Sequence, residues 1–201
     1  MTNHPTTFQD RARALTGATL ARAGAALWRL GVHPDAITVA GLGVVAASAL
    51  FVAQGRFQLA GVILILGLPL DALDGAVARA MGRKGRFGGV LDSTLDRYAD
   101  GLIFGAFAYY FAAQDALNYM LLALASLVGS FVVSYVRARA GEAGLAVRVG
   151  LLDRLVRLLL ILLALMIPLL LIPVLWVLAV GSNVTGVQRL WYVHQHLDRE
   201  G

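Results

Sequence analysis

Four aspartates, at Asp71, Asp74, Asp92 and Asp96, stand in a stretch that is otherwise rich in apolar and small residues. An aspartate at the centre of a bilayer helix costs roughly 2.5 kcal/mol or more, so such residues usually face a polar cavity and serve a site. Hard divalent cations prefer oxygen ligands. Two such ions about 3.5–4 Å apart can act on one phosphoryl group. The cluster therefore predicts metal-assisted phosphoryl chemistry at a membrane.

The spacing of these acids indicates how they come together. The first two are three residues apart and the last two are four apart, so each pair shares one face of a helix. A glycine-rich basic turn at 82–89 separates the pairs, and the two helices are expected to be antiparallel neighbours. The alternative is a packing cluster neutralised by Arg79 and Arg97. It is disfavoured because four acids would face too few buried bases.

Composition places the chain in the membrane. Its 201 residues are 59% hydrophobic and only 14% charged, and mean hydropathy is +0.74. These values predict an integral membrane protein. The absence of cysteine excludes disulfides and thiol catalysis. The net charge of +5 favours anionic lipid or a phosphorylated substrate over nucleic acid as the partner.

The expected architecture is all-α, with an N-terminal amphipathic surface helix over about 7–30 followed by six transmembrane helices. A short helix packed on the protein is the alternative for 7–30. The expected spans are about 36–55, 58–80, 90–113, 116–137, 151–167 and 173–195. Pro168 and Pro173 favour a break between the last two, although one long kinked helix is the alternative. The predicted divisions are an N-terminal segment at 1–35, the membrane domain at 36–195 and a tail at 196–201.

The distribution of basic residues predicts the orientation. All lysines and arginines except Arg56 fall at one end of the expected spans. By the positive-inside rule, both termini and the acidic cluster face the cytoplasm. The predicted location is the plasma membrane of a prokaryote, with the cluster accessible to a soluble nucleotide.

The acidic stretch also has a recognisable pattern, D-x2-D-G-x2-A-R-x8-G-x3-D-x3-D. It resembles the signature of the CDP-alcohol phosphotransferase family. Every fixed position is filled, by Asp71, Asp74, Gly75, Ala78, Arg79, Gly88, Asp92 and Asp96.

The resemblance implies transfer of a phosphatidyl group from CDP-diacylglycerol to an alcohol, with release of CMP. It implies two divalent ions, Mg²⁺ or Mn²⁺, and a homodimer. Asp96 would be a further metal ligand and would also take the proton from the acceptor hydroxyl. The remaining roles it implies are metal binding by Asp71, Asp74 and Asp92, and a CDP pocket formed by Asp71, Asp74, Gly75, Ala78, Arg79 and Gly88.

Arginines at the expected cytoplasmic helix ends suggest a phosphorylated acceptor. Arg137, Arg157 and Arg189 are the candidates for its phosphate, with anchoring by the positive-inside rule as the alternative for each. The segment 134–144, SYVRARAGEAG, resembles bacterial phosphatidylinositol-phosphate synthases, which use inositol 1-phosphate. Ser134 and Asp100 are candidates for the acceptor hydroxyls.

Three other interpretations stay open at this stage. Asp100 could instead belong to a polar network with Arg97. A phosphatidylglycerophosphate synthase using glycerol 3-phosphate would also need a phosphate site, so the arginines alone do not separate the two acceptors. A cation transporter could use the same acids, but it would favour carboxylates near the midplane and often repeated halves.

Overall fold

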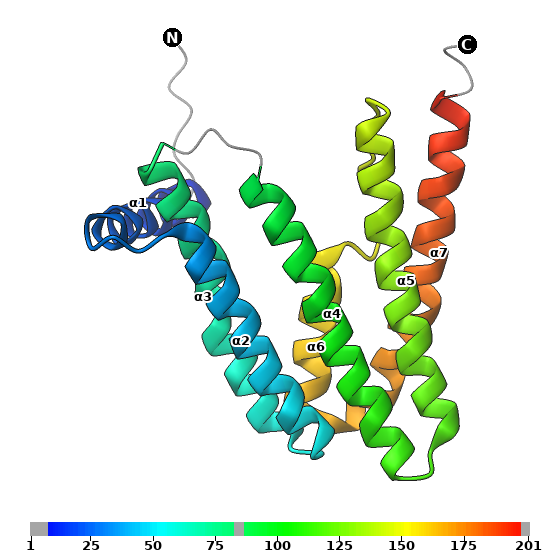
Figure 1. The fold of residues 1–201 in the computed structure, drawn as a ribbon. Helices are drawn as coiled ribbons and strands as arrows, with labels where there is room; N and C mark the ends of the chain where they lie inside the picture. Colours follow the sequence, from blue (N-terminus) through cyan, green and yellow to red (C-terminus); the bar gives the residue numbers. More distant parts are fainter. Residues whose placement is uncertain (1–7, 83–86, 198–201) are drawn as a thin grey trace. The chain divides into compact units, whose positions relative to one another are not determined.

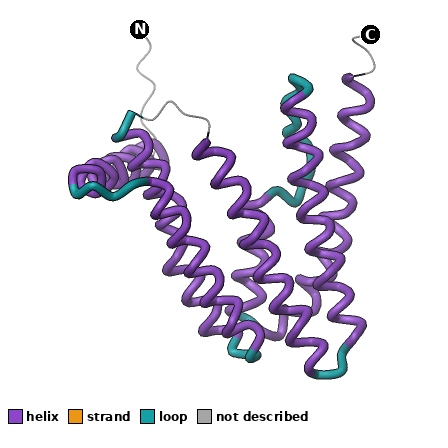
Figure 2. Tube along the Cα trace, viewed as in Figure 1, coloured by secondary structure: helices purple, strands orange, loops and turns teal. Residues whose placement is uncertain are grey.

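The long apolar runs fold as helices, as their composition predicts. The computed structural model describes residues 8–82 and 87–197, with 8–16 described as backbone only. Within these ranges, α-helices and one short 3₁₀ helix are joined by loops, without strands (Figures 1 and 2). The helices are α1 (Phe8–Arg29), α2 (Pro34–Ala53), α3 (Phe57–Ala80), α4 (Phe87–Ala113), α5 (Leu117–Glu142), α6 (Arg154–Met166), η1 (Pro168–Leu170) and α7 (Leu171–Leu197).

The all-α membrane class is confirmed, whereas six spans are not shown. Four described stretches are long and apolar enough to cross a bilayer, namely α2, α3, α5 and Pro168–Leu197. Helix α4 carries Asp92, Asp96, Arg97 and Asp100 in its first half, which lowers its hydropathy. Helix α6 has 13 residues, about 20 Å, which is shorter than the roughly 30 Å hydrocarbon core.

The chain breaks between α6 and α7, as the two prolines predict. Ile167 has φ −124° and ψ 85°, a conformation outside the α-helical region, which proline disfavours for the residue before it. Pro168 then begins η1. Pro173 lies in the first turn of α7, where a missing N–H is tolerated. The two-helix interpretation is therefore confirmed, and the single kinked helix is excluded.

The structure divides into two compact units, which are described separately. The first comprises residues 1–43 and 66–96, and the second comprises 44–65 and 97–201. Helices α2, α3 and α4 contribute residues to both. The four candidate metal ligands all belong to the first unit, and the candidate phosphate-binding arginines belong to the second.

In the first unit, α1 packs closely on α3. A Cβ placed on Gly24 would lie 2.6 Å from the carbonyl carbon of Ala76, so no larger residue fits without a shift. Ala76 and its neighbour Val77 are both buried. The predicted N-terminal helix thus exists and packs on the protein, while its contact with a membrane surface stays a prediction.

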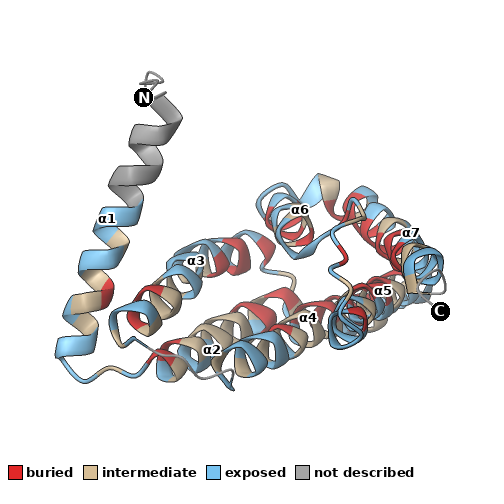
Figure 3. Cartoon of the chain, turned by 90° about the horizontal axis from the view of Figure 1, so that it is seen from above, coloured by how far each residue is buried: buried red, intermediate tan, exposed pale blue. Residues whose placement is uncertain are grey.

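In the second unit, α5 and α7 lie side by side, and their buried residues face inward (Figures 1 and 3). Small residues allow the close approach, since a Cβ on Gly129 would lie 2.8 Å from the Cβ of Ser182. Asn183 Nδ2 donates to the carbonyl of Ala125 at 3.0 Å and so ties α7 to α5. This pairing supports the helix ends that carry the candidate arginines.

Candidate active site

Carboxylates from two helices of the first unit come together. The end of α3 supplies Asp71 and Asp74, and the start of α4 supplies Asp92 and Asp96. Asp71 and Asp92 are exposed, Asp74 is half-buried and Asp96 is buried. The charges of Asp71 and Asp92 both act on Asp74, which places the three in one region of the unit. Their binding of a shared ion stays a prediction.

A threonine from a third helix holds Asp74. Thr38 Oγ1 lies 2.8 Å from Asp74 Oδ2, to which it can donate its proton, and 3.1 Å from the carbonyl of Pro34. The backbone N–H of Gly75 also donates to this carboxylate. Sequence reasoning missed Thr38. Its signal was a hydroxyl one helical turn after the proline that begins α2.

Helix α2 also approaches Asp71. A Cβ placed on Gly41 would lie 3.8 Å from Asp71 Oδ1, at ordinary contact distance. Gly41 and Thr38 are three residues apart and so share a face of α2. That face therefore lies against the acidic residues of α3, and an alanine at position 41 would still fit.

The candidate ligands are of the type that binds hard divalent cations, although they are not arranged around one ion position. Every candidate ligand is a carboxylate, the donor type that Mg²⁺ and Mn²⁺ take. Among the described residues, no three His, Asp or Glu side chains stand close enough to share one ion. The fit therefore lies in the chemistry of the donors and in their common location.

One small residue of the pattern, Gly75, lies beside Arg79. Its Nη1 would be 3.3 Å from a Cβ placed on Gly75, so the guanidinium lies close over the glycine. Arg79 is exposed, and Ala78 and Gly88 are half-buried. The part of the basic turn at 83–86 lies outside the described residues. A cation over a bare backbone could bind a diphosphate, as the predicted pocket requires.

In the second unit, Arg157 is a buried ion-pair partner of Asp100. Its side chain is 2% exposed, and Nη2 lies 3.2 Å from Asp100 Oδ2. Its Nη1 donates to the carbonyl of Leu152, also at 3.2 Å. Sequence reasoning missed this pair, which joins α4 to α6 across 57 positions. Asp100 thus has a structural partner, and its predicted contact with an acceptor hydroxyl is not tested.

Arg189 is also buried and is bonded to backbone. Its Nε donates to the carbonyl of Val149 and its Nη1 to that of Val133, both at 2.9 Å. The charges of Arg137 and Arg157 act on Arg189, so the three lie in one region of the second unit, while their binding of a phosphate stays a prediction. Arg137 is exposed, and Ser134, one turn earlier on α5, is half-buried.

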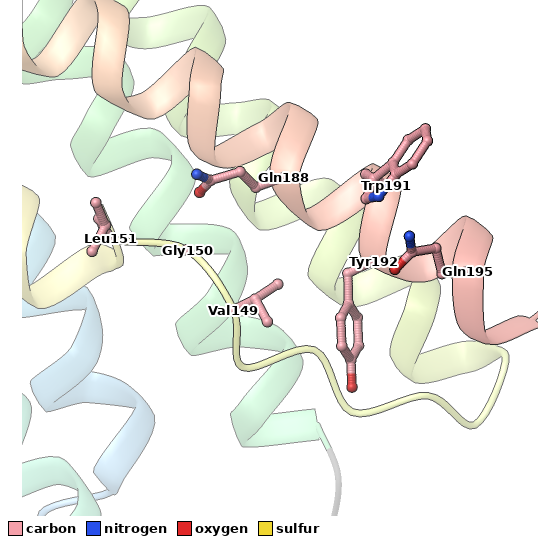
Figure 4. A pocket seen from close by; sticks show the side chains of 7 residues that line it. All are labelled: Val149, Gly150, Leu151, Gln188, Trp191, Tyr192 and Gln195. Atoms are coloured by element: carbon pink, nitrogen blue, oxygen red, sulfur yellow. The ribbon is translucent and has the colours of Figure 1, made fainter.

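A shallow pocket of about 520 Å³ lies between the loop before α6 and the end of α7 (Figure 4). None of the predicted site residues lines it. One lining residue, Val149, accepts a hydrogen bond from Arg189 through its carbonyl. Its lining residues are Val149, Gly150, Leu151, Gln188, Trp191, Tyr192 and Gln195.

Comparison with known families gives the class of the protein. Residues 31–188 match the family described as CDP-alcohol phosphatidyltransferase. The chain belongs to this family. Its membership removes the cation-transporter interpretation, because the family is one of enzymes that act on CDP-alcohols.

Named relatives extend over most of the chain. A phosphatidylinositol phosphate synthase from Streptomyces avermitilis is 40% identical over 193 residues, covering 89% of this chain and 79% of that protein. An archaetidylinositol phosphate synthase from Pyrococcus horikoshii is 38% identical over 182 residues, covering 89% and 93%.

Solved structures of this family are similar to the chain over most of its length. The phosphatidylinositol phosphate synthase of Mycobacterium tuberculosis with CDP-DAG bound superposes with a TM-score of 0.82 at 34% identity. The match covers 87% of this chain and 92% of that one. The same enzyme in complex with manganese and citrate gives a TM-score of 0.79 at 33% identity, covering 87% and 88%.

Proposed function

We propose that the chain transfers a phosphatidyl group from CDP-diacylglycerol to inositol 1-phosphate and releases CMP. The observation that carries the proposal is that Asp71, Asp74 and Asp92 fill the family's acidic pattern in a chain whose residues 31–188 match the family. The named relatives, one of them solved with CDP-DAG, support the choice of substrates. We place the enzyme in a prokaryotic plasma membrane as a homodimer, with the acidic cluster facing the cytoplasm.

The proposed cofactor is a pair of Mg²⁺ or Mn²⁺ ions held by Asp71, Asp74 and Asp92, with Asp96 as a further ligand. Such ions neutralise the diphosphate and stabilise the leaving CMP when bound. The manganese complex of the Mycobacterium tuberculosis enzyme supports this choice. Arg79 would add a fixed positive charge toward the diphosphate, and the small side chains of Gly75, Ala78 and Gly88 would leave room for the nucleotide.

Asp96 is assigned the proton-transfer step. The acceptor oxygen attacks the phosphorus of the phosphatidyl group, the bond from that phosphorus to the CMP oxygen breaks, and the acceptor's proton moves to Asp96. Burial of Asp96 favours this role, because a shielded carboxylate is protected from competing water. A positioned base contributes roughly 10²–10⁴-fold to such a step.

The acceptor's phosphate is assigned to Arg137, Arg157 and Arg189. Arg157 and Arg189 are held in place by the Asp100 carboxylate and by backbone carbonyls, so each guanidinium is oriented in advance. Arg137 is exposed and is the member best placed to meet a soluble ligand. Ser134 and Asp100 are proposed to contact the acceptor's hydroxyls.

An acceptor panel tests the proposal. Purified protein is given CDP-diacylglycerol, Mn²⁺ and one acceptor at a time, and CMP release is measured. Inositol 1-phosphate is expected to be used in preference to glycerol 3-phosphate, free inositol and serine. A preference for glycerol 3-phosphate would move the assignment to phosphatidylglycerophosphate synthesis. No metal-dependent CMP release with any acceptor would overturn the enzymatic assignment.

Replacing Thr38 by valine is expected to weaken metal binding about tenfold. The substitution keeps the shape but removes the hydroxyl that holds Asp74 at 2.8 Å, and the loss of such a supporting partner typically costs 10–100-fold in metal affinity. The measurement is the Mn²⁺ concentration that gives half-maximal CMP release. Thr38→Ser keeps the hydroxyl and serves as the control. Equal metal dependence of the valine variant and the wild type would show that Thr38 does not support a ligand.

Replacing Asp96 by asparagine is expected to lower turnover at least about 100-fold, because an amide cannot accept the acceptor's proton. Binding of CDP-diacylglycerol, measured by calorimetry with Mn²⁺ present, should stay within a few-fold of the wild type. If the variant loses that binding as fully as Asp71→Asn does, Asp96 acts chiefly as a metal ligand and the base assignment is wrong.

A further inference from the structure

The loop that enters α6 is held on α7 by two hydrogen bonds to its backbone. Arg189 Nε donates to the carbonyl of Val149 at 2.9 Å. The N–H of Leu152 donates to Thr185 Oγ1 at 3.3 Å. Both α7 side chains are buried, Thr185 at 1% exposure. The path of the loop is therefore set by α7 just before α6 begins.

Thr185 makes two contacts that only threonine combines. Its hydroxyl accepts from Leu152, and its methyl group packs against the backbone of Gly150. A Cβ placed on Gly150 would lie 2.4 Å from Thr185 Cγ2, and Gly150 has a φ of +109°, a conformation that L side chains rarely adopt. Valine at 185 would fill the space but could not accept the hydrogen bond from Leu152. Serine would accept that hydrogen bond but would not fill the space.

Leu152 links Thr185 to Arg157. Its N–H is bonded to Thr185, and its carbonyl accepts from Arg157 Nη1 at 3.2 Å. The other terminal nitrogen of Arg157 is paired with Asp100. These two interactions hold the guanidinium in one orientation, and one of the two acceptors is a backbone carbonyl in the loop. Any movement of Leu152 would turn Arg157.

We propose that Thr185 is a positioning residue for acceptor binding. It fixes the carbonyl of Leu152 and thereby the orientation in which Arg157 meets the acceptor's phosphate. The inference rests on the proposed function, which assigns Arg157 to that phosphate. Thr185 itself touches no substrate. Its effect reaches the reaction through Arg157, because charge-assisted recognition of phosphate by a planar guanidinium depends on alignment.

The test compares Thr185→Val with Thr185→Ser. In Thr185→Val, the KM for inositol 1-phosphate is expected to rise about three- to tenfold, the usual effect of losing one neutral hydrogen bond. The KM for CDP-diacylglycerol should not change. Amide exchange at 149–153 should become faster. Thr185→Ser keeps the hydroxyl and should resemble the wild type in all three measurements.

Ser126→Ala is the matched control. Its hydroxyl is equally buried in the α5–α7 contact and bonds to the carbonyls of Leu122 and Leu175, away from the loop. The variant should leave the acceptor KM and the exchange at 149–153 unchanged. An equal rise in acceptor KM in Ser126→Ala would mean that general loosening of α7, and not the Leu152 bond, is responsible, and would overturn the inference.

The remaining outcomes separate the two proposals. A wild-type protein that does not use inositol 1-phosphate overturns the proposed function and with it the role of Thr185 in acceptor binding. A wild-type protein that uses it, with an unchanged acceptor KM in Thr185→Val, overturns the Thr185 inference alone. A Thr185→Ser variant as impaired as Thr185→Val would show that the hydroxyl alone does not hold the loop, and would overturn the hydrogen-bond argument.

Discussion

Asp92→Asn is expected to lower CMP release at least about 100-fold while the protein stays folded. Asp92 is exposed on α4, and its charge acts on Asp74. Asparagine keeps the shape of the side chain but removes the anionic ligand. A catalytic metal supplies several kcal/mol of charge stabilisation, and each 1.36 kcal/mol is tenfold in rate. Asp71→Asn, at the other exposed acid of the cluster, should behave alike.

Stability measurements give this prediction a second readout. The three neighbouring carboxylates repel one another, so removing the charge of Asp92 should not lower the melting temperature in metal-free buffer. In the wild type, Mn²⁺ should raise the melting temperature, because a ligand that binds only the folded state stabilises it by mass action. In Asp92→Asn that Mn²⁺-dependent rise should largely disappear.

Asp115→Asn is the matched control. Asp115 has a positive φ of 54° in the loop after α4, a conformation that asparagine adopts readily. This variant removes one aspartate charge without touching the acidic cluster, so its turnover and its Mn²⁺ response should match the wild type. Near-normal turnover of Asp92→Asn with saturating Mn²⁺ would count decisively against metal binding by the cluster.

Local sequence rules account for the helices and for the pairing of the acids on two helices. Pro34 and Pro168 each begin a helical segment, because the first turn of a helix tolerates the missing N–H of proline. The three- and four-residue spacings place each acid pair on one helix face. The glycine-rich stretch at 82–89 predicts that those helices are neighbours. These features depend on residues near one another in the chain, so they can be predicted before the tertiary structure is known.

The partners of the site residues could not be predicted in this way. Thr38 and Asp74 are 36 positions apart, Asp100 and Arg157 are 57 apart, and Arg189 bonds to a carbonyl 56 positions earlier. Each contact depends on which faces two helices present to each other, and helix periodicity does not determine that choice. The number of membrane spans could not be predicted from local sequence patterns either, because α6 is short and α4 carries charged residues.

Arg137→Gln is expected to raise the KM for inositol 1-phosphate roughly ten- to a hundredfold. A charge-assisted hydrogen bond is worth about 1.5–3 kcal/mol, and each 1.4 kcal/mol corresponds to tenfold in affinity. The KM for CDP-diacylglycerol should change little, because that substrate is assigned to the acidic cluster. Use of free inositol, which has no phosphate to recognise, should not worsen. Steady-state kinetics with each substrate varied in turn measures all three quantities.

Arg137 is the arginine whose substitution can be interpreted. It is exposed, whereas Arg157 and Arg189 are buried. Arg157→Gln would leave the Asp100 carboxylate without its ion-pair partner, and Arg189→Gln would leave two backbone carbonyls without theirs. Breaking a buried pair by removing one partner typically costs about 3–5 kcal/mol of stability. A loss of activity in those variants would therefore mix altered recognition with a weakened fold.

Arg139→Gln supplies the comparison for Arg137. Arg139 is an exposed arginine two residues further along α5, paired with Glu142, and a two-residue step turns it to another side of the helix. It carries the same charge at nearly the same depth, so membrane anchoring predicts similar effects for both variants. Phosphate recognition predicts a raised acceptor KM for Arg137→Gln alone. An unchanged acceptor KM in Arg137→Gln, or an equal rise in the Arg137 and Arg139 variants, would mean that Arg137 serves in membrane anchoring and not in phosphate recognition.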